Sequence, residues 1–178
     1  MKLNELTILE YSNLLESKKS VPGGGSALAL VLELSCSLCL MVCNFTIEKK
    51  GYENVTDRVK NIAEEVKEIK NQAHILIDED GLAYQMVMDA YKTKDASLIS
   101  KASIYGCEVP FKLFNLTKKC ELLCEEMIKI GNKNLKSDAK IGRDLCKAIY
   151  EGCLDNIRCN IDSIIEENIK EKYLNLLK

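Results

Sequence analysis

Apolar residues recur along most of this chain at the three- and four-residue steps of an α-helix. The longest such pattern has apolar residues at positions Val59, Ile62, Val66, Ile69, Ala73, Leu76, Ala83, Val87 and Ala90. A second pattern occupies positions Leu113, Leu116, Cys120, Leu123, Met127 and Ile130. No segment alternates between apolar and polar residues for long, which argues against strands. The pattern predicts an all-α fold.

Capping and glycine residues indicate the helix boundaries in the first third of the chain. Thr7 and Glu10 have the spacing of a capping box, in which each side chain accepts a hydrogen bond from the backbone of the other. They predict a first helix over residues 8–17. The glycine-rich stretch 22–26 is expected to be a loop, and the apolar run 27–45 then forms the second helix.

Proline and polar residues divide the second half of the chain. A helix over about residues 96–107 is expected to end before Pro110, and a new helix follows over residues 111–130. The two remaining helices are expected at 138–160, with Ser137 or Asp138 as the N-cap, and at 163–177, with Asp162 as the N-cap.

The helix lengths predict the architecture. A helix of about 30 residues is about 45 Å long, whereas a compact chain of this size has a radius of gyration of about 16 Å. We therefore expect a single domain over residues 1–178, an elongated antiparallel bundle of about five to six helices. The apolar helix 27–45 leaves faces that water solvates poorly, which favours a homo-oligomer.

The charge balance and the start of the sequence exclude several function classes. Lys and Arg number 25 and Asp and Glu number 27, a net charge of −2, so no global field attracts nucleic acid. The first residues lack the basic and apolar regions of a signal peptide, so we expect a cytoplasmic protein with reduced thiols. Glu33 and Asn44 interrupt the apolar run 27–45, which favours a buried helix over a membrane span.

The nine cysteines allow a metal interpretation and a packing interpretation. Cys36, Cys39 and Cys43 share one helix face, and Cys120 and Cys124 share another. Structural zinc usually takes two ligand pairs carried on turns, whereas these residues lie in apolar helices far from the only histidine. We therefore expect no metal, and cysteines that act as small buried residues between closely packed helices.

Proton transfer falls mainly to groups other than imidazole. The single histidine, His74, lies one position off the apolar face of its helix and is expected on the flank. Asp80 occupies that apolar face between Leu76 and Ala83. A carboxylate buried there needs a partner or has a raised pKa, to which the charges at 78–79 would add. An ion pair or helix cap and an acid in a cleft both stay open as interpretations.

Two further groups of polar or small residues offer binding sites. The triplet Gly23-Gly24-Gly25 followed by Ser26 can present free N–H groups to a carboxylate or phosphate, although a tight turn with Ser26 as N-cap explains it equally well. Asn156 and Asn160 lie on one helix face that should be apolar. Their amides either link buried helices or hydrogen-bond a heteroaromatic ligand.

Several short motifs follow one another along nearly the whole chain: Pro22-Gly23-Gly24-Gly25-Ser26, Met41 to Ile47, Lys49-Lys50-Gly51-Tyr52, Ile77-Asp78-Glu79-Asp80, Val109-Pro110, Gly131 to Asn134, Ser137-Asp138 and Asn156 to Ile161. In this order they resemble the cyclodeaminase/cyclohydrolase family. That family comprises the cyclodeaminase domain of formiminotransferase-cyclodeaminase and free-standing bacterial methenyltetrahydrofolate cyclohydrolases. A glycine triplet alone would be a weak signal, but the ordered set is a strong one.

The resemblance implies an all-helical folate enzyme, active as a homodimer, with a tetrahydrofolate derivative as substrate and no tightly bound cofactor. Cyclohydrolases add water to 5,10-methenyltetrahydrofolate to give 10-formyltetrahydrofolate. Cyclodeaminases close a 5-formimino group onto N10 with loss of ammonia. Both reactions pass through a tetrahedral carbon bonded to the N5 and N10 atoms of the folate.

On this basis our hypothesis places Asp80 near that carbon as the base, with Asp78 orienting it or carrying a proton to the departing nitrogen. The pterin edge is assigned to Asn156, Asn160, Ser137 and Asp138. The glutamate tail is assigned to Gly23, Gly24, Gly25, Ser26, Lys49 and Lys50, because carboxylates suit helix N-termini and ammonium groups.

One segment departs from the family pattern. The family usually carries a Leu-Pro-Lys turn and a longer charged loop after the acidic helix, whereas residues 91–95 connect almost directly to the next helix. A more open site favours water, so we predict a methenyltetrahydrofolate cyclohydrolase, with formiminotetrahydrofolate cyclodeaminase as the alternative. A non-catalytic folate-binding or scaffold protein is the alternative from another class.

Overall fold

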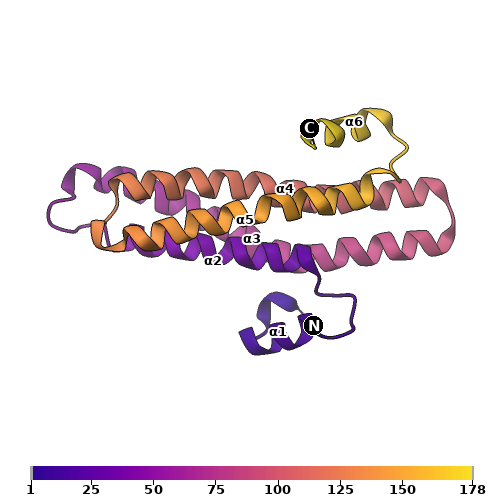
Figure 1. The fold of residues 1–178 in the computed structure, drawn as a ribbon, viewed down its shortest axis with the longest axis horizontal. Coiled ribbons are helices and arrows are strands. Elements are labelled where there is room, and N and C mark those ends of the chain that lie inside the picture. Colours follow the sequence, from indigo (N-terminus) through magenta and orange to yellow (C-terminus); the bar gives the residue numbers. More distant parts are fainter. Residues whose placement is uncertain (1, 178) are drawn as a thin grey trace. The chain divides into compact units, whose positions relative to one another are not determined.

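Helices make up the regular structure of the protein in a computed structural model that describes residues 2–177 (Figure 1). The six α-helices are α1 (Ile8–Leu15), α2 (Gly24–Asn44), α3 (Thr56–Thr93), α4 (Ala96–Ile130), α5 (Lys136–Ile161) and α6 (Glu167–Leu176). Short 3₁₀ turns occupy Leu3–Glu5, Glu53–Val55 and Lys133–Leu135. No strand occurs among residues 2–177, which confirms the all-α prediction.

The first helix has the predicted capping box. Thr7 Oγ1 accepts a hydrogen bond from the Glu10 N–H at 3.2 Å, and Glu10 Oε2 accepts one from the Thr7 N–H at 2.9 Å. These bonds satisfy N–H groups that a helix start leaves unpaired. α1 therefore begins at Ile8 as predicted and ends two residues before the predicted end.

The second helix begins earlier than predicted, because Gly24 and Gly25 form its first turn. Among the described glycines only Gly51 has a positive φ, at 90°. Left-handed backbone is therefore not the reason for glycine at positions 24 and 25.

α4 is one continuous helix, so the predicted interruption at Pro110 is wrong. Pro110 has no N–H and leaves the carbonyl of Gly106, four residues earlier, without its helical donor. The Gly106 oxygen instead accepts a hydrogen bond from Asn160 Nδ2 of α5 at 3.4 Å. A side chain from another helix thus takes the place of the missing N–H.

The start of α5 also differs from the prediction. Asn132 caps the 3₁₀ turn Lys133–Leu135, which leads directly into α5. Ser137 and Asp138 therefore lie in the first turn of α5 and do not cap it.

α6 starts after Glu166 and not after Asp162 as predicted. Ser100 of α4 holds this start, because its hydroxyl donates to the Glu166 carboxylate and accepts from the Ile165 N–H at 3.0 Å. Contacts with a helix distant in sequence therefore decide where the last helix begins.

Tertiary contacts group the chain into two compact units. Unit 1 consists of Met1–Ala29, Ile75–Phe114 and Glu151–Lys178, and unit 2 consists of Leu30–His74 and Asn115–Tyr150. A core cluster of unit 1 contains the buried residues Cys107, Ile157, Ile161, Ile164 and Tyr173. The expectation of one domain over residues 1–178 stays a prediction.

Unit 2 has a core rich in small cysteine side chains, all fully buried: Cys36, Cys39, Cys43, Cys120, Cys124 and Cys146. The sulfur atoms of Cys36 and Cys120 are 3.5 Å apart. Nearby, Ser35 Oγ donates to the Gly142 carbonyl at 2.7 Å. These contacts bring α2 close to α4 and α5, as the packing interpretation predicted.

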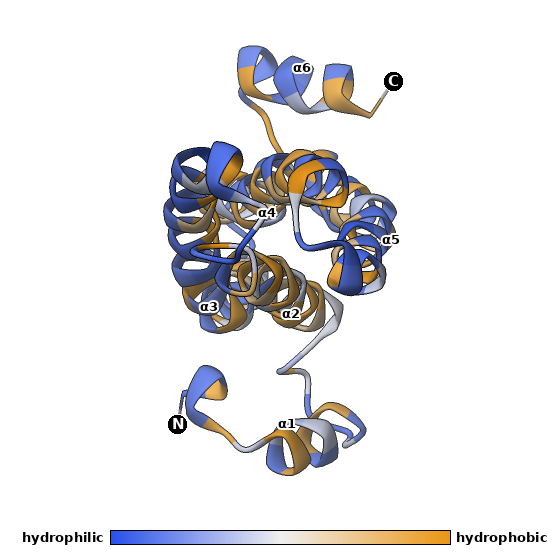
Figure 2. Ribbon diagram, turned by 90° about the vertical axis from the view of Figure 1, so that its left-hand side faces the viewer, coloured by the Kyte–Doolittle hydropathy of each residue, from blue (hydrophilic) through white to orange (hydrophobic). Residues whose placement is uncertain are grey.

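α2 is apolar over nearly its whole length (Figure 2). By length and composition it could cross a membrane, although the core helix of a soluble protein passes the same test. One side of α2 is built into the core through the fully buried residues Leu32, Cys36, Cys39 and Val42. The other side leaves Leu34 51% exposed, and Phe45, the residue after the end of α2, is 60% exposed.

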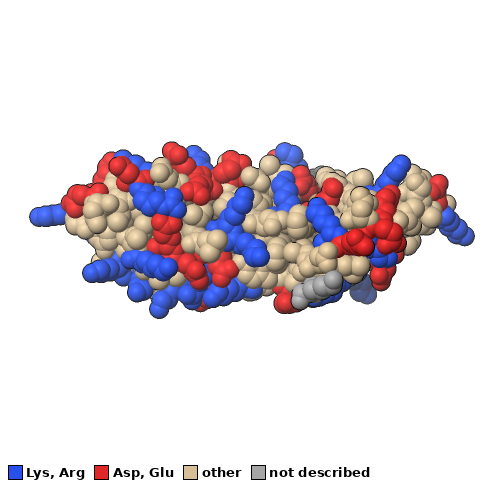
Figure 3. Space-filling view, turned by 90° about the horizontal axis from the view of Figure 1, so that it is seen from above, with Lys and Arg blue, Asp and Glu red and all other residues tan. Residues whose placement is uncertain are grey.

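Charged side chains of both signs are interspersed on the face of the protein shown in Figure 3. Arg58 pairs with Glu65 and Glu126, at 3.1 Å and 2.6 Å. Neither sign of charge covers the whole of the face in Figure 3, in keeping with the net charge of −2.

Candidate active site

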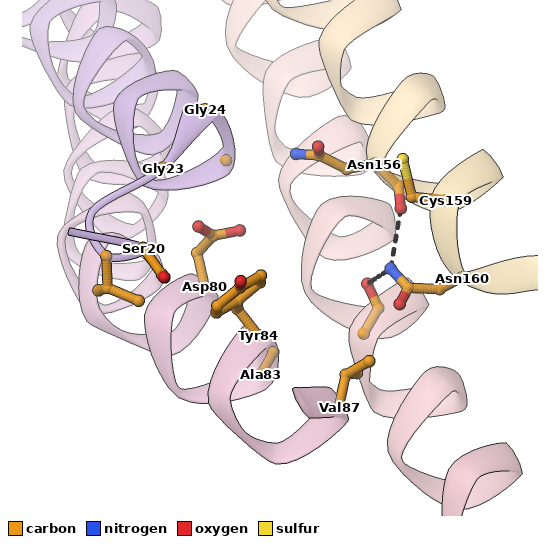
Figure 4. A pocket seen from close by; sticks show the side chains of 13 residues that line it. Ser20, Gly23, Gly24, Asp80, Ala83, Tyr84, Val87, Asn156, Cys159 and Asn160 are labelled. Carbon is orange, nitrogen blue, oxygen red and sulfur yellow. Dashed lines mark hydrogen bonds between the residues drawn. The ribbon is translucent and has the colours of Figure 1, made fainter. Parts of the chain in front are cut away.

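A cavity of about 410 Å³ lies in unit 1, where the start of α2 meets α3, α4 and α5. It is lined by Ser20, Val21, Gly23, Gly24 and Gly25, by Asp80, Ala83, Tyr84 and Val87 of α3, by Gly106 of α4, and by Asn156, Cys159 and Asn160 of α5. Figure 4 shows Asp80 across the cavity from Asn156 and Asn160. Asp80 is the one charged side chain in this lining.

One carboxylate oxygen of Asp80 is held by a hydrogen bond, and the other is available to the cavity. Oδ2 accepts a hydrogen bond from the Ser26 N–H at 2.9 Å, while Oδ1 has no hydrogen bond to another described residue. Burial raises the pKa of Asp80, and the Ser26 N–H offsets part of that rise. The cause is therefore desolvation and not the charges of Asp78 and Glu79.

Close approach explains the glycine at position 25. A Cβ atom on Gly25 would lie 2.0 Å from Asp80 Oδ1 and 2.9 Å from Asn156 Nδ2. The carboxylate oxygen and the amide nitrogen therefore both approach the same point on the α2 backbone. Gly24, in contrast, has no such neighbour within 4 Å.

The hydrogen bonds of Asn160 fix the direction of its amide. Nδ2 donates to the Gly106 carbonyl at 3.4 Å and to the Asn156 carbonyl at 3.0 Å (Figure 4). Carbonyls only accept, so the nitrogen faces them and Oδ1 is left as an acceptor. Asn160 thus links α5 to α4, as one interpretation predicted, and keeps an oxygen for a ligand.

Ser26 does not line the cavity. It is fully buried, and its hydroxyl donates to the Ile77 carbonyl at 2.8 Å and lies 2.9 Å from the Tyr11 hydroxyl. Its amide is engaged by Asp80. The structure therefore does not place Ser26 in the cavity lining, and its predicted contact with substrate stays a prediction.

Asp78 also lies outside this cavity. It lines a second cavity of about 490 Å³, and its Oδ1 accepts a hydrogen bond from the Leu3 N–H at 2.6 Å. Residues two apart on a helix point to different faces, so Asp78 and Asp80 do not act on one point. The placement gives no support to Asp78 as a second catalytic carboxylate.

The remaining predicted contacts belong to unit 2 and not to the cavity lining: Lys49, Lys50, Ser137 and Asp138. Lys49 Nζ donates to Asn132 Oδ1 at 2.9 Å. The roles assigned to these four residues stay predictions.

Seven of the cavity residues were not predicted as site residues from the sequence: Ser20, Val21, Ala83, Tyr84, Val87, Gly106 and Cys159. Tyr84 and Cys159 lie one helical turn after residues that were selected, so the helical period could have found them. Gly106 stands four residues before Pro110, and its signal is the carbonyl that a proline leaves without a donor. Nothing in the sequence indicated Tyr11, because it is connected to Asp80 only through a hydrogen bond to Ser26.

The cavity combines a proton acceptor with hydrogen-bonding groups. A buried carboxylate with a raised pKa can take a proton from water, and side-chain amides can bind the edge of a flat polar ligand. Among residues 2–177, no group of three or more His, Cys, Asp or Glu side chains is arranged to hold a metal ion.

Known proteins resemble this chain over most of its length. The sequence profile of the family described as formiminotransferase-cyclodeaminase matches residues 7–178. Methenyltetrahydrofolate cyclohydrolase of Methylorubrum extorquens is 28% identical over 97% of this chain and 87% of that protein. Formimidoyltransferase-cyclodeaminase of Gallus gallus is 23% identical over 86% of this chain and 30% of that protein. The chain thus spans about a third or less of the bifunctional relatives.

The fold is shared with a solved structure. The crystal structure of formiminotetrahydrofolate cyclodeaminase from Thermotoga maritima has a TM-score of 0.94 and 31% sequence identity, covering 99% of this chain and 88% of that one. The resemblance predicted from the ordered motifs is therefore confirmed. Since the family profile covers nearly all residues, the chain belongs to the formiminotransferase-cyclodeaminase family.

Proposed function

We propose that this chain is a methenyltetrahydrofolate cyclohydrolase, which converts 5,10-methenyltetrahydrofolate and water to 10-formyltetrahydrofolate. The observation that carries the proposal is Asp80 Oδ1, which has no hydrogen-bond partner among residues 2–177 and lies near Asn156. A carboxylate there can pair with a cationic substrate and act as base toward water. The M. extorquens relative, which bears this name, supports the choice of reaction.

The reaction needs two proton transfers, and Asp80 can serve both. Water attacks the carbon between N5 and N10 and gives a proton to Oδ1, which leaves a hydroxylated tetrahedral carbon. The bond from that carbon to N5 then breaks, and the Asp80 carboxylic acid returns its proton to N5. The hydroxyl proton leaves to solvent as the formyl carbonyl forms. One water is consumed and one proton is released.

The asparagines suit the pterin ring. Asn160 offers its Oδ1 because its nitrogen is engaged by two carbonyls, so it pairs with an N–H donor of the ligand. Asn156 has an amide near Asp80 and can complete the edge. The backbone at Gly23 and Gly24 lines the same cavity at the start of α2, where a substrate carboxylate is favoured.

The link between α3 and α4 bears on which nucleophile enters. α3 ends at Thr93 and α4 begins at Ala96, so the link consists of Lys94 and Asp95. A link this short has no length to fold over a cavity, which favours attack by water. Formiminotetrahydrofolate cyclodeaminase is the second candidate, because the T. maritima protein with that name shares the fold at 31% identity.

The test compares the two substrates and two neighbouring carboxylates. We expect the purified protein to remove the absorbance of 5,10-methenyltetrahydrofolate, and to release little ammonia from 5-formiminotetrahydrofolate. Asp80→Asn should lower kcat by about 10²- to 10⁴-fold, the usual contribution of a general base. Asp78→Asn is the matched control, and its kcat should stay near that of the wild type because Asp78 lies outside the cavity.

Three results would decide against the proposal. Ammonia release without hydrolysis favours the cyclodeaminase, and binding of both folates without turnover favours a scaffold protein. Unchanged kcat in Asp80→Asn removes Asp80 from the mechanism. Loss of fold is not expected to explain a lowered kcat in Asp80→Asn. Burial raises the pKa of Asp80, so the ionised carboxylate lowers stability as pH rises through that pKa. Asp80→Asn should therefore be at least as stable as the wild type at neutral pH.

We also propose that the protein acts as a homodimer in the cytoplasm. One side of α2 carries Leu34, Leu38 and Met41, and Phe45 follows the end of the helix at the same spacing. Leu34 and Phe45 are more than half exposed, whereas Leu38 and Met41 are partly buried. Exposed apolar side chains grouped in this way suit an interaction surface. A second copy covering this face would remove it from water.

A further inference from the structure

Tyr11 of α1 is connected to Asp80 through Ser26. The Tyr11 hydroxyl lies 2.9 Å from Ser26 Oγ, which lies 2.8 Å from the Ile77 carbonyl oxygen. That oxygen can only accept, so it takes the Ser26 hydroxyl hydrogen and Tyr11 must donate to Ser26. The Ser26 N–H then donates to Asp80 Oδ2 at 2.9 Å. The donor and the acceptor of each of these three hydrogen bonds are thereby assigned.

Burial makes this chain of bonds hard to replace by water. Ser26 is fully buried and Tyr11 is 6% exposed. Burial also raises the pKa of Tyr11, a rise that the hydrogen bond to Ser26 partly offsets and the charge of Asp80 increases. The phenol therefore stays protonated and remains a donor. A buried hydroxyl that loses its partner leaves the remaining groups unsatisfied.

The bonds of Ser26 hold one turn of α3 against the start of α2. Ser26 contacts that turn twice, at the Ile77 carbonyl and at Asp80 Oδ2. With Oδ2 held, the Asp80 carboxylate cannot rotate freely, and Oδ1 is the oxygen directed to the cavity. Gly25 leaves the room that this orientation needs.

We propose that Tyr11 and Ser26 are positioning residues, which hold Asp80 so that Oδ1 receives the proton during catalysis. The inference rests on the proposed function of Asp80. Neither residue lines the cavity, so neither touches substrate.

The surroundings of Asp80 contain few groups that titrate. α1 contributes Tyr11, and α5 contributes Cys153, whose pKa is raised to about 12 by burial and by the charge of Asp80, and Cys159 in the cavity lining. α3 itself contributes Tyr84, with Asp78 and Glu79 on its other faces, and α4 contributes only Gly106 to the lining. A change in the pKa of Asp80 can therefore be attributed to a change in the hydrogen bond from the Ser26 N–H to Asp80 Oδ2.

The test removes the two hydroxyls separately and together. Tyr11→Phe and Ser26→Ala should each lower kcat about 3- to 10-fold, the worth of about one hydrogen bond, with KM within about twofold. The double variant should lose about as much as Ser26→Ala alone, because Tyr11 acts through Ser26. Ser35→Ala is the matched control: Ser35 is also buried on α2 and also donates to a carbonyl of another helix, but it lies in unit 2. Its kcat should stay near that of the wild type.

A second readout needs no substrate. The pKa of Asp80 can be followed by NMR in protein labelled with ¹³C at the aspartate carboxyls, with Asp80→Asn identifying the signal. The hydrogen bond from the Ser26 N–H lowers this pKa. If Tyr11→Phe or Ser26→Ala weakens that bond, the pKa of Asp80 should rise. The acid limb of kcat/KM should move to higher pH by the same amount, because the base must be ionised.

The outcomes separate this inference from the proposed function. A wild-type protein that turns over neither folate overturns the proposed function, while the NMR titration still tests the hold on Asp80. An unchanged pKa of Asp80 in both variants overturns the positioning role, even if the enzyme is active. Equal losses of kcat in Ser26→Ala and Ser35→Ala also overturn it, because they indicate a general loss of packing.

Discussion

The missing side chain at position 25 is a functional feature of the site. The Asp80 carboxylate and the Asn156 amide occupy the space in which a Cβ of residue 25 would lie. Gly24, its neighbour in the same helical turn, is exposed and faces open space. The two glycines look alike in the sequence and both line the cavity, yet only at position 25 would a Cβ collide with Asp80.

We therefore expect different results from the two alanine substitutions. Gly25→Ala should displace the Asp80 carboxylate and lower kcat by at least about tenfold, because reacting groups tolerate little misplacement. Gly24→Ala adds a Cβ in open space, so it should lower kcat much less than Gly25→Ala does. It should also raise the melting temperature, since alanine favours a helix by up to about 1 kcal/mol over glycine. Steady-state kinetics and thermal unfolding measure both effects. Wild-type activity in Gly25→Ala would contradict the close approach.

At the level of single residues, the sequence predicted best which face of its helix a residue occupies. Asp80 was selected because it interrupts an apolar face, and the structure places it half-buried in the cavity lining. Asp78 was selected from its motif, although it lies off that face, and it contacts Leu3 instead of the cavity. The hydroxyl of Ser26 could not be assigned from sequence, because its partners Tyr11 and Ile77 are distant along the chain.

At Pro110, a side chain of α5 supplies the hydrogen-bond donor that α4 lacks. The proline deprives the Gly106 carbonyl of a donor within α4, and Asn160 of α5 supplies one. The same bond directs Asn160 Oδ1 away from the two carbonyls that hold its nitrogen. A residue that would be expected to break α4 thus helps to orient a cavity residue on α5.

This arrangement predicts a coupling between positions 110 and 160. Asn160→Ala should lower the free energy of unfolding by about 1 kcal/mol, because the Gly106 carbonyl loses its donor. In the background of Pro110→Ala the same change should cost less, since alanine restores the helical N–H. Denaturant unfolding of the four proteins gives the coupling energy. Additive losses would show that the 3.4 Å bond contributes nothing.

Helix ends with local signals were predictable, and those set by tertiary contacts were not. The Thr7–Glu10 capping box located α1 because all its bonds lie within four residues. The Gly106 carbonyl inside α4 receives its donor from Asn160, and Ile165 just before α6 bonds to Ser100. Neither partner is near its target in the sequence.

At the scale of the molecule, the exposed apolar side of α2 leads to a test of assembly. Leu34→Glu should convert the proposed dimer to a monomer, because it places a charge on the face that a second copy would cover. Leu122→Glu on α4 is the matched control, since Leu122 is also exposed, at 65%, but lies on another helix. Sedimentation velocity reports the change. A wild-type monomer, or a dimer unaffected by Leu34→Glu, would contradict this interface.

The fold class and the family were accessible from the sequence, because helical periodicity and ordered motifs extend over the whole chain. The assignment of residues to two units was not accessible. Lys49 and Ser137 belong to unit 2, whereas Asp80 and Asn156 belong to unit 1. Motif order carries no information on which segments contact one another.

Cys159 offers an exposed thiol to which a reporter group can be coupled. It is the exposed thiol among nine cysteines whose other members are buried, and it lines the cavity beside Asn156 and Asn160. Burial raises the pKa of Cys107 and Cys153 to about 12, so these thiols stay neutral and react slowly with alkylating reagents. A fluorophore can therefore be coupled selectively to Cys159 in the natural sequence. Its emission would report whether the cavity is occupied, without any cysteine having to be engineered in or out.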